Sequence, residues 1–207
     1  MTTQNGIDDD TIVFFISDNG APLAINKEDL PLTNSDPNWD GSLNDPWVGE
    51  KGMLTEGAIR IPFIVRWKNH LPSGLVYNEP VISIDASTTA AALAGINTDS
   101  MDGVNLIPYL KNPDRKLKRN LYWRFWNQAA IRKDNWKYLN AGSYGEYLFD
   151  LNNPEHENKN YIHDRPDIAV ALKGDLLMWS TTLKRPGLPS QHLNGAEQAW
   201  YKHYFAK

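Results

Sequence analysis

The sequence predicts an α/β layer followed by a small antiparallel sheet that carries one helix. In the N-terminal half, apolar strand candidates are separated by a loop and followed by a helical stretch, which is the order of a layered α/β fold. In the C-terminal half, four short strand candidates are separated by turn residues, which is typical of an antiparallel meander. We place the boundary between the two parts after residue 112, so that they span residues 1–112 and 113–207.

Two strands and one helix are expected in the first part. Thr11–Ser17 is a continuous run of apolar, β-branched and aromatic residues, as in a strand covered on both faces, so we expect a central parallel strand. Residues 21–50 are rich in Pro, Asn, Asp and Gly and predict a long irregular loop. Ile61–Trp67 is the second strand, and Asp85–Ala94 is a helix that Gly95 ends.

The second part is expected to form a meander with one helix on it. The strand candidates are residues 120–126, 129–132, 136–139 and 147–151. Residues 167–183 have apolar side chains near helical spacing, and Pro186 and Gly187 end that helix. The aromatic tail, residues 189–207, either packs back on this subdomain or contacts a partner.

Composition excludes several classes of function. The 207 residues carry a formal net charge of -4, so no basic face attracts nucleic acid or an anionic membrane. No stretch approaches the roughly 18 apolar residues that cross a bilayer. The chain has no cysteine, which excludes disulfides, thiolate zinc sites and any nucleophile derived from cysteine. The polar, acidic start leads directly into an apolar strand, so we expect a fragment that begins in the middle of a fold.

A metal site is one interpretation of the residues that follow the first strand. Asp18 and Asn19 supply a carboxylate and an amide carbonyl, the hard oxygen donors that calcium or magnesium takes. They stand at the carboxyl end of the strand, where open α/β sheets bind ligands. The alternative is that Asp18–Gly20 is simply a turn.

An anion site is one interpretation of the glycine-rich segment Gly49–Pro62. Its glycines flank Lys51 closely enough for backbone to approach a ligand, and an ammonium there offsets charge on a sulfate or phosphate oxygen. The alternative is a solvated surface lysine. Glu56 and Arg60 are four residues apart and form either a structural pair or a substrate contact.

Three motifs in this order resemble the second half of the sulfatase signature. They are Ile12–Gly20, the pattern Gly-x-Lys-Gly-x-x-x-Glu-Gly-x-x-Arg-x-Pro over Gly49–Pro62, and Val65–Trp67. Further segments similar to the family are Pro80–Asp85, Leu93–Gly95, Asp102–Pro108, Ala130–Lys137 and Tyr147–Glu155. The resemblance covers nearly the whole chain from Thr11 to about Leu183 and implies part of an alkaline-phosphatase-like sheet over residues 1–112.

The resemblance implies a sulfuric ester hydrolase with a defined set of groups. By resemblance Asp18 and Asn19 ligate calcium or another divalent cation such as Mg²⁺, and Lys51 is the catalytic and substrate-binding lysine that contacts the sulfate. The family nucleophile is a formylglycine made in a Cys/Ser-x-Pro-x-Arg motif well upstream of these residues. This chain does not contain that motif, so we expect it to be inactive alone. Ala58 replaces a second glycine that the family often has.

Two other functions stay open. One is a phosphate or phosphonate monoester hydrolase of the same superfamily, and the other is a non-catalytic module that binds sulfated glycans. The expected partners are a sulfated small molecule or glycan, and the missing N-terminal half or a second copy at an exposed sheet edge. Trp39 and Trp47 precede Lys51 and either contact substrate or pack. The resemblance implies a periplasmic or extracellular parent enzyme.

Overall fold

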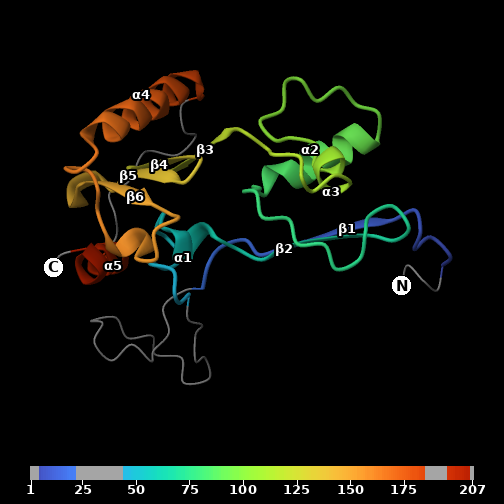
Figure 1. Ribbon diagram of the computed structural model, residues 1–207, viewed down its shortest axis with the longest axis horizontal. Coiled ribbons are helices and arrows are strands. Elements are labelled where there is room, and N and C mark those ends of the chain that lie inside the picture. Colours follow the sequence, from blue (N-terminus) through green and yellow to red (C-terminus); the bar gives the residue numbers. More distant parts are fainter. Residues whose placement is uncertain (1–4, 22–43, 185–194, 206–207) are drawn as a thin grey trace. The chain divides into compact units, whose positions relative to one another are not determined.

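The computed structural model describes residues 5–21, 44–184 and 195–205 (Figure 1). The contacts divide the chain into two compact units. Unit 1 is Met1–Ser17 with Pro62–Lys118, and unit 2 is Asp18–Ile61 with Arg119–Lys207. The boundary after residue 112 stays a prediction. Trp39, most of the long loop, and the helix stop at Pro186 and Gly187 lie outside the described residues.

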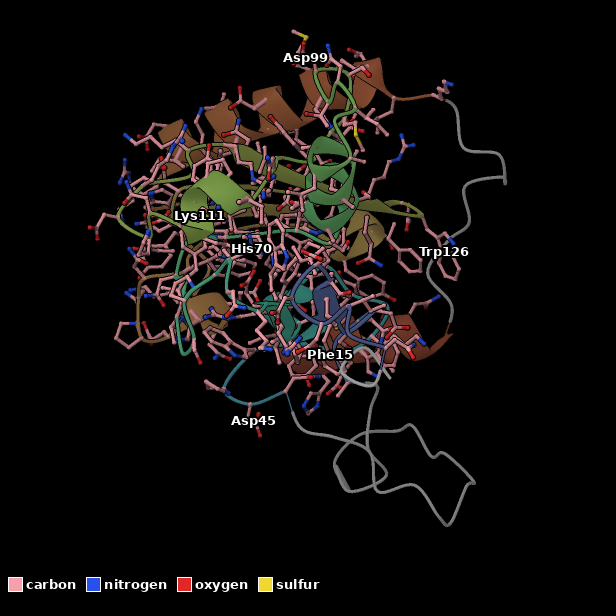
Figure 2. All side chains as sticks on the ribbon, turned by 90° about the vertical axis from the view of Figure 1, so that its right-hand side faces the viewer. Phe15, Asp45, His70, Asp99, Lys111 and Trp126 are labelled. Carbon is pink, nitrogen blue, oxygen red and sulfur yellow. The ribbon has the colours of Figure 1, made fainter. Side chains whose placement is uncertain are left out.

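The sheet of unit 1 corrects the prediction of a central parallel strand. Strand β1 (Ile12–Ile16) pairs antiparallel with β2 (Phe63–Trp67). Burial alternates along both strands, and the outer face exposes 63% of Phe15 and 58% of Ile64. Figure 2 marks Phe15 on β1. A continuous apolar run shows that both faces of a strand are apolar. It does not show what covers each face or which strand pairs with it, so the sequence alone could not define the partner of β1.

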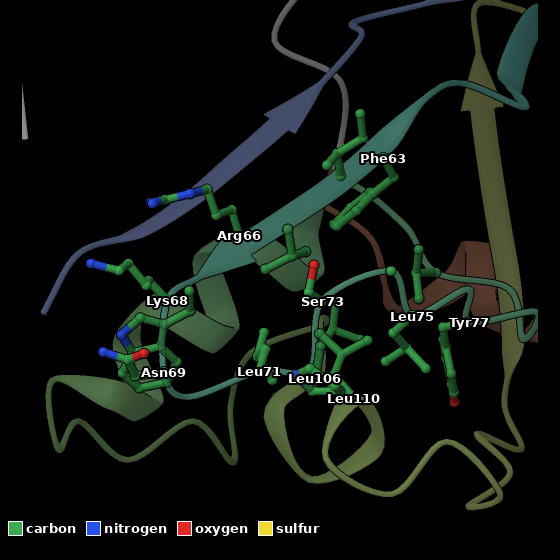
Figure 3. A pocket seen from close by; sticks show the side chains of 16 residues that line it. Phe63, Arg66, Lys68, Asn69, Leu71, Ser73, Leu75, Tyr77, Leu106 and Leu110 are labelled. Atoms are coloured by element: carbon green, nitrogen blue, oxygen red, sulfur yellow. The ribbon is translucent and has the colours of Figure 1, made fainter. Parts of the chain in front are cut away.

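The inner face of β2 packs on α3 (Ile107–Leu110), where Phe63 and Val65 meet Leu110. Helix α2 (Ile84–Leu93) belongs to the same unit. Gly95 has φ +75° just after α2, and its N–H donates to the carbonyl of Ala92, so the predicted helix end is confirmed. A cavity of about 790 Å³ in this unit is lined mostly by apolar side chains, including Phe63, Leu106 and Leu110 (Figure 3).

The meander of unit 2 confirms the prediction for the C-terminal half. It consists of β3 (Asn120–Phe125), β4 (Gln128–Lys133), β5 (Trp136–Asn140) and β6 (Glu146–Asp150), antiparallel and in sequence order. Each strand pairs with the next because short turns join them. Two short 3₁₀ helices, η1 (Gly142–Tyr144) and η2 (His156–Asn158), flank β6.

The two faces of this sheet carry different cores. Alternation along β4, β5 and β6 sends Ile131, Tyr138 and Leu148 to one face, where they pack with α4 (Pro166–Thr182). The neighbouring residues Ala130, Leu139 and Phe149 point to the other face. There they pack with α1 (Glu56–Ile59) and α5 (Gly195–Phe205) (Figure 1). The tail therefore packs back on the subdomain, as one of the two alternatives predicted.

Among the described residues, the helices are too short or too polar to cross a membrane.

Candidate functional site

The predicted metal ligands form a compact turn after β1. Asp18 is exposed, and its Oδ1 accepts the backbone N–H of Asn19 at 3.0 Å. The side-chain Nδ2 of Asn19 donates to the carbonyl oxygen of Gly20 at 2.9 Å, which turns the Asn19 Oδ1 to the opposite side. Both side chains thus have orientations set by local hydrogen bonds, as is usual for Asp and Asn in turns.

Glycine contacts join this turn to the segment that contains Lys51. The N–H of Gly20 donates to the carbonyl of Ala58 at 2.7 Å, and a Cβ atom on Gly20 would lie 1.9 Å from the Gly57 oxygen. A Cβ atom on Gly57 would in turn lie 2.4 Å from the Gly49 oxygen. Gly20 and Gly57, from two separate motifs, are therefore needed because backbone packs directly on backbone, whereas Gly49 is favoured by its φ of +95°.

Asn44 completes the junction between the two motifs. Its Oδ1 accepts the N–H of Ala21 at 2.9 Å, and its Nδ2 lies within hydrogen-bond distance of the carbonyls of Ala21 and Gly49. The N–H of Lys51 donates to the same Ala21 carbonyl at 3.3 Å. The Lys51 backbone is thus hydrogen-bonded to Ala21, which stands two residues after Asn19. The Lys51 side chain is exposed.

The turn after β1 supplies the right kind of donor for a hard cation, but too few donors to complete a site. Asp18 and Asn19 contribute oxygen donors, the kind that calcium and magnesium take, but calcium takes about six to eight of them. In the described ranges no group of three or more His, Asp or Glu residues is arranged to hold a metal. Further ligands would have to come from elsewhere.

Buried polar side chains form hydrogen bonds with the residues on either side of Lys51. Glu50 is 1% exposed, and its carboxylate accepts hydrogen bonds from the Tyr204 hydroxyl at 2.8 Å and from Asn44 at 3.2 Å. The carbonyl of Gly52 accepts the amide of Gln128 at 2.9 Å, and the Gln128 oxygen accepts the hydroxyl of Tyr201. The segment is thus held by groups from β4 and α5.

A buried ion network holds the following helix, α1. The ammonium of Lys137, whose side chain is fully buried, lies 3.0 Å from Glu56 Oε1 and 2.9 Å from Glu157 Oε1. Glu157 Oε2 accepts the backbone N–H of Glu56 at 2.7 Å. Arg132 lies 3.7 Å from the other Glu56 oxygen. Two carboxylates therefore face two cations, which keeps the buried charge balanced.

The three buried groups of this network have shifted pKa values. Burial raises the pKa of Glu157 to about 7, with the attraction of Lys137 opposing the shift. Burial also opposes ionisation of Glu56, but Lys137 and Arg132 together hold its pKa below the ordinary value. Burial disfavours charge on Lys137, but the two carboxylates outweigh it and raise the Lys137 pKa.

The contacts of Glu56, Arg60 and Trp47 in unit 2 correct the prediction of a structural pair between Glu56 and Arg60. Glu56 pairs with Lys137 rather than with Arg60, because Glu56 points into the core and Arg60 is exposed. The Arg60 guanidinium lies 3.9 Å above the centre of the Trp47 ring. The His156 ring centre lies 4.7 Å from that of Trp47, and His156 is half-buried. Trp47 therefore packs between neighbours, and a substrate contact stays a prediction.

The sequence reasoning missed Lys137 and Glu157. A lysine in a short strand suggests an exposed position, and Glu157 stands in a polar stretch, so neither looked functional. The available signal was that Lys137 ends one segment that resembles the sulfatases, and that another such segment stops two residues before Glu157.

Solved structures define the class of fold. Ps i-CgsB in complex with k-i-k-neocarrahexaose matches 98% of this chain and 43% of its own, with a TM-score of 0.69 and 24% identity. The phosphonate monoester hydrolase of Agrobacterium radiobacter matches 87% of this chain and 37% of its own, with a TM-score of 0.60 and 18% identity. The chain shares the fold of these structures, which confirms the expected alkaline-phosphatase-like fold.

The sequence comparison identifies the family within that class. The family described as N-sulphoglucosamine sulphohydrolase, C-terminal, matches residues 47–178. The chain therefore belongs to the sulfatase family. Mus musculus N-acetylgalactosamine-6-sulfatase is 34% identical over 135 residues, which are 64% of this chain and 24% of that protein. The chain thus spans about a quarter of that relative's length.

Proposed function

We propose that this chain supplies the cation-binding turn and the sulfate-binding lysine of a sulfuric ester hydrolase. Asp18 and Asn19 would hold calcium or a similar divalent cation, and Lys51 would bind the sulfate. The observation that carries the proposal is the hydrogen bond from the Lys51 N–H to the Ala21 carbonyl, two residues after Asn19. Family membership supports assigning these roles.

The proposed chemistry follows from charge. The sulfate group carries negative charge on its oxygens both in the bound ester and in the transition state, and a fixed ammonium offsets that charge. Lys51 is exposed and would present such a point charge. When bound, the cation supplies further positive charge to the same oxygens. The formylglycine nucleophile would come from polypeptide outside this chain, so the chain alone would bind sulfate without hydrolysing its esters.

Two alternative functions are tied to specific observations. The likeness to a phosphonate monoester hydrolase favours phosphate or phosphonate esters as substrates, since that enzyme shares the fold. The folded, polar support behind Lys51 is equally compatible with a module that binds sulfated glycan without catalysis. A sulfated glycan or small molecule is the partner in the first and last of the three proposals.

A protein partner is proposed for the outer face of the β1–β2 ribbon. Phe15 and Ile64 expose apolar surface there, and such surface usually marks an interface. We propose that the remaining part of a sulfatase fold covers it, and that otherwise a second copy does. A periplasmic or extracellular parent enzyme stays a prediction.

The test compares this chain with a longer polypeptide that adds a segment with the formylglycine motif. Both are assayed with 4-nitrophenyl sulfate and 4-nitrophenyl phosphate in the presence of calcium. We expect the longer polypeptide to cleave the sulfate ester, and this chain to cleave neither but to bind inorganic sulfate. Faster cleavage of the phosphate ester would favour the phosphate hydrolase. Calcium-independent glycan binding with no hydrolysis in either polypeptide would favour the binding module.

A further inference from the structure

We propose that Lys137, Glu56 and Glu157 act together as a positioning network that sets the geometry of the Lys51 segment. This inference rests on the proposed function, because Lys51 is taken as the sulfate-binding group. None of the three side chains is exposed, so none is placed to touch a ligand directly. Their role would be exerted through the backbone.

The first step runs from Glu157 to the start of α1. Thr55 stands at the N-cap position of this short helix but makes no side-chain cap hydrogen bond. Glu157, 101 residues further along the chain, accepts the N–H of Glu56 at 2.7 Å in its place. Lys137 then fixes the Glu157 carboxylate by an ion pair at 2.9 Å. The first turn of α1 is thus bonded to β5 and η2 rather than capped by its own sequence.

The second step runs from α1 to Lys51. Gly57 follows Glu56, and its N–H donates to the carbonyl of Val48 at 2.7 Å. A side chain on Gly57 has no room, since its Cβ atom would lie 2.4 Å from the Gly49 oxygen. A shift of the first turn of α1 would therefore displace the backbone immediately before Lys51. Closely packed backbone segments move together, because the atoms between them cannot be compressed.

The third step concerns why the network is ionic. Replacing a buried ion pair by apolar groups often leaves a protein as stable or makes it more stable, so such a pair is weak evidence for a stabilising role. Here the Glu157 carboxylate also accepts one backbone N–H in a fixed direction, which an apolar residue could not do. Arg132, 3.7 Å from Glu56, keeps one carboxylate paired if Lys137 and Glu157 are both neutralised.

The test uses the double variant Lys137→Met/Glu157→Gln, which removes one charge of each sign. The matched control is Lys133→Met/Asp175→Asn, which neutralises an exposed pair at 3.0 Å in the same unit. Three quantities are measured: the melting temperature, amide hydrogen exchange, and the affinity for inorganic sulfate in calcium buffer by calorimetry. The amides of Met53 and Gly57 report on the segment, because both are bonded within it.

We expect the double variant to fold and its Met53 and Gly57 amides to exchange at least about tenfold faster, while the amides of α4 keep their protection. Sulfate affinity should fall by about tenfold or more, and the control should change neither quantity. Equal loss of protection in the segment and in α4, or unchanged exchange at Met53 and Gly57, would overturn the proposal. If the double variant does not fold, Glu157→Gln alone is measured in the same way, with the same two outcomes.

If no form of the protein binds sulfate, the proposed function fails. Hydrogen exchange at Met53 and Gly57 still decides whether the network positions the Lys51 segment.

Discussion

The carbonyl oxygen of Gly57 lies where a side chain on Gly20 would begin, 1.9 Å from an ideal Cβ atom. One glycine follows the proposed metal ligands and the other belongs to the segment of Lys51, so this contact joins the two halves of the candidate site. An ideal Cβ atom on Gly57 would likewise lie only 2.4 Å from the Gly49 oxygen. Such spacing leaves no room for even a methyl group.

Gly57→Ala should destabilise the protein by about 1–3 kcal/mol, because the new methyl group meets two backbone carbonyls that cannot rotate away. Chemical denaturation measures this change. Gly174→Ala in α4 is the matched control: its methyl group meets nothing within 4 Å, so we expect a gain of about 0.5–1 kcal/mol. Equal effects of the two substitutions would contradict the packing described for Gly57.

Lys51→Ala should lower kcat/KM for an aryl sulfate by about 10²–10³-fold in the polypeptide that includes the nucleophile segment, since it removes a charge proposed to offset that of the transition state. The melting temperature should not change, because the Lys51 side chain is exposed. Lys111→Ala, at an exposed lysine of unit 1, is the control. Activity within twofold of the parent would remove Lys51 from the site.

Asp18→Asn should weaken calcium binding by on the order of tenfold, since calcium affinity follows the number of charged ligands. Isothermal titration with calcium measures the change, and Asp99→Asn at another exposed aspartate is the control. If the two variants bind calcium equally well, Asp18–Gly20 is a turn without a metal role.

The raised pKa of Glu157 predicts a pH-dependent stability. The folded state holds the Glu157 proton up to about pH 7, whereas the unfolded chain releases it near the ordinary value of 4.5. The folded state therefore binds more protons in this window, and this contribution to stability is lost as pH rises from about 4.5 to 7. Each kcal/mol lost lowers the melting temperature by about 2–4 °C.

Glu157→Gln should flatten that decline, because glutamine does not titrate. Melting curves of parent and variant at pH 5, 6 and 7 provide the comparison. A parallel decline in both proteins would assign the pH dependence to other groups.

Phe15→Ser should reduce self-association of the isolated chain, because it removes the larger exposed apolar group of the β1–β2 ribbon. Sedimentation velocity at several concentrations measures it. Val76→Ser is the control, since Val76 is 75% exposed but lies outside the ribbon. Unchanged association in Phe15→Ser would exclude this face as the contact between copies.

The meander and α4 could be predicted because their signals are local. The hairpin strands from Asn120 to Asp150 pair with their sequence neighbours, so turn residues define the order. The pairing of β1 could not be predicted, since its partner Phe63–Trp67 follows more than forty residues later and the apolar run has no period that defines one buried face.

The candidate site likewise contains residues that could be predicted from the sequence and residues that could not. Asp18, Asn19 and Lys51 stand in short motifs that are visible in the sequence. Lys137 and Glu157 acquire their surroundings only when β5, η2 and α1 meet, and a lone charged residue gives no sign of burial beforehand.

The Tyr204 hydroxyl reaches Glu50 from a helix 154 residues further along the chain. Transplanting Gly49–Pro62 into an unrelated scaffold would therefore transfer the sequence of the motif but not its backbone conformation. Engineering of a sulfate receptor from this protein should start from the whole of unit 2, and shortening it at the carboxyl end would remove a brace of the very segment to be kept.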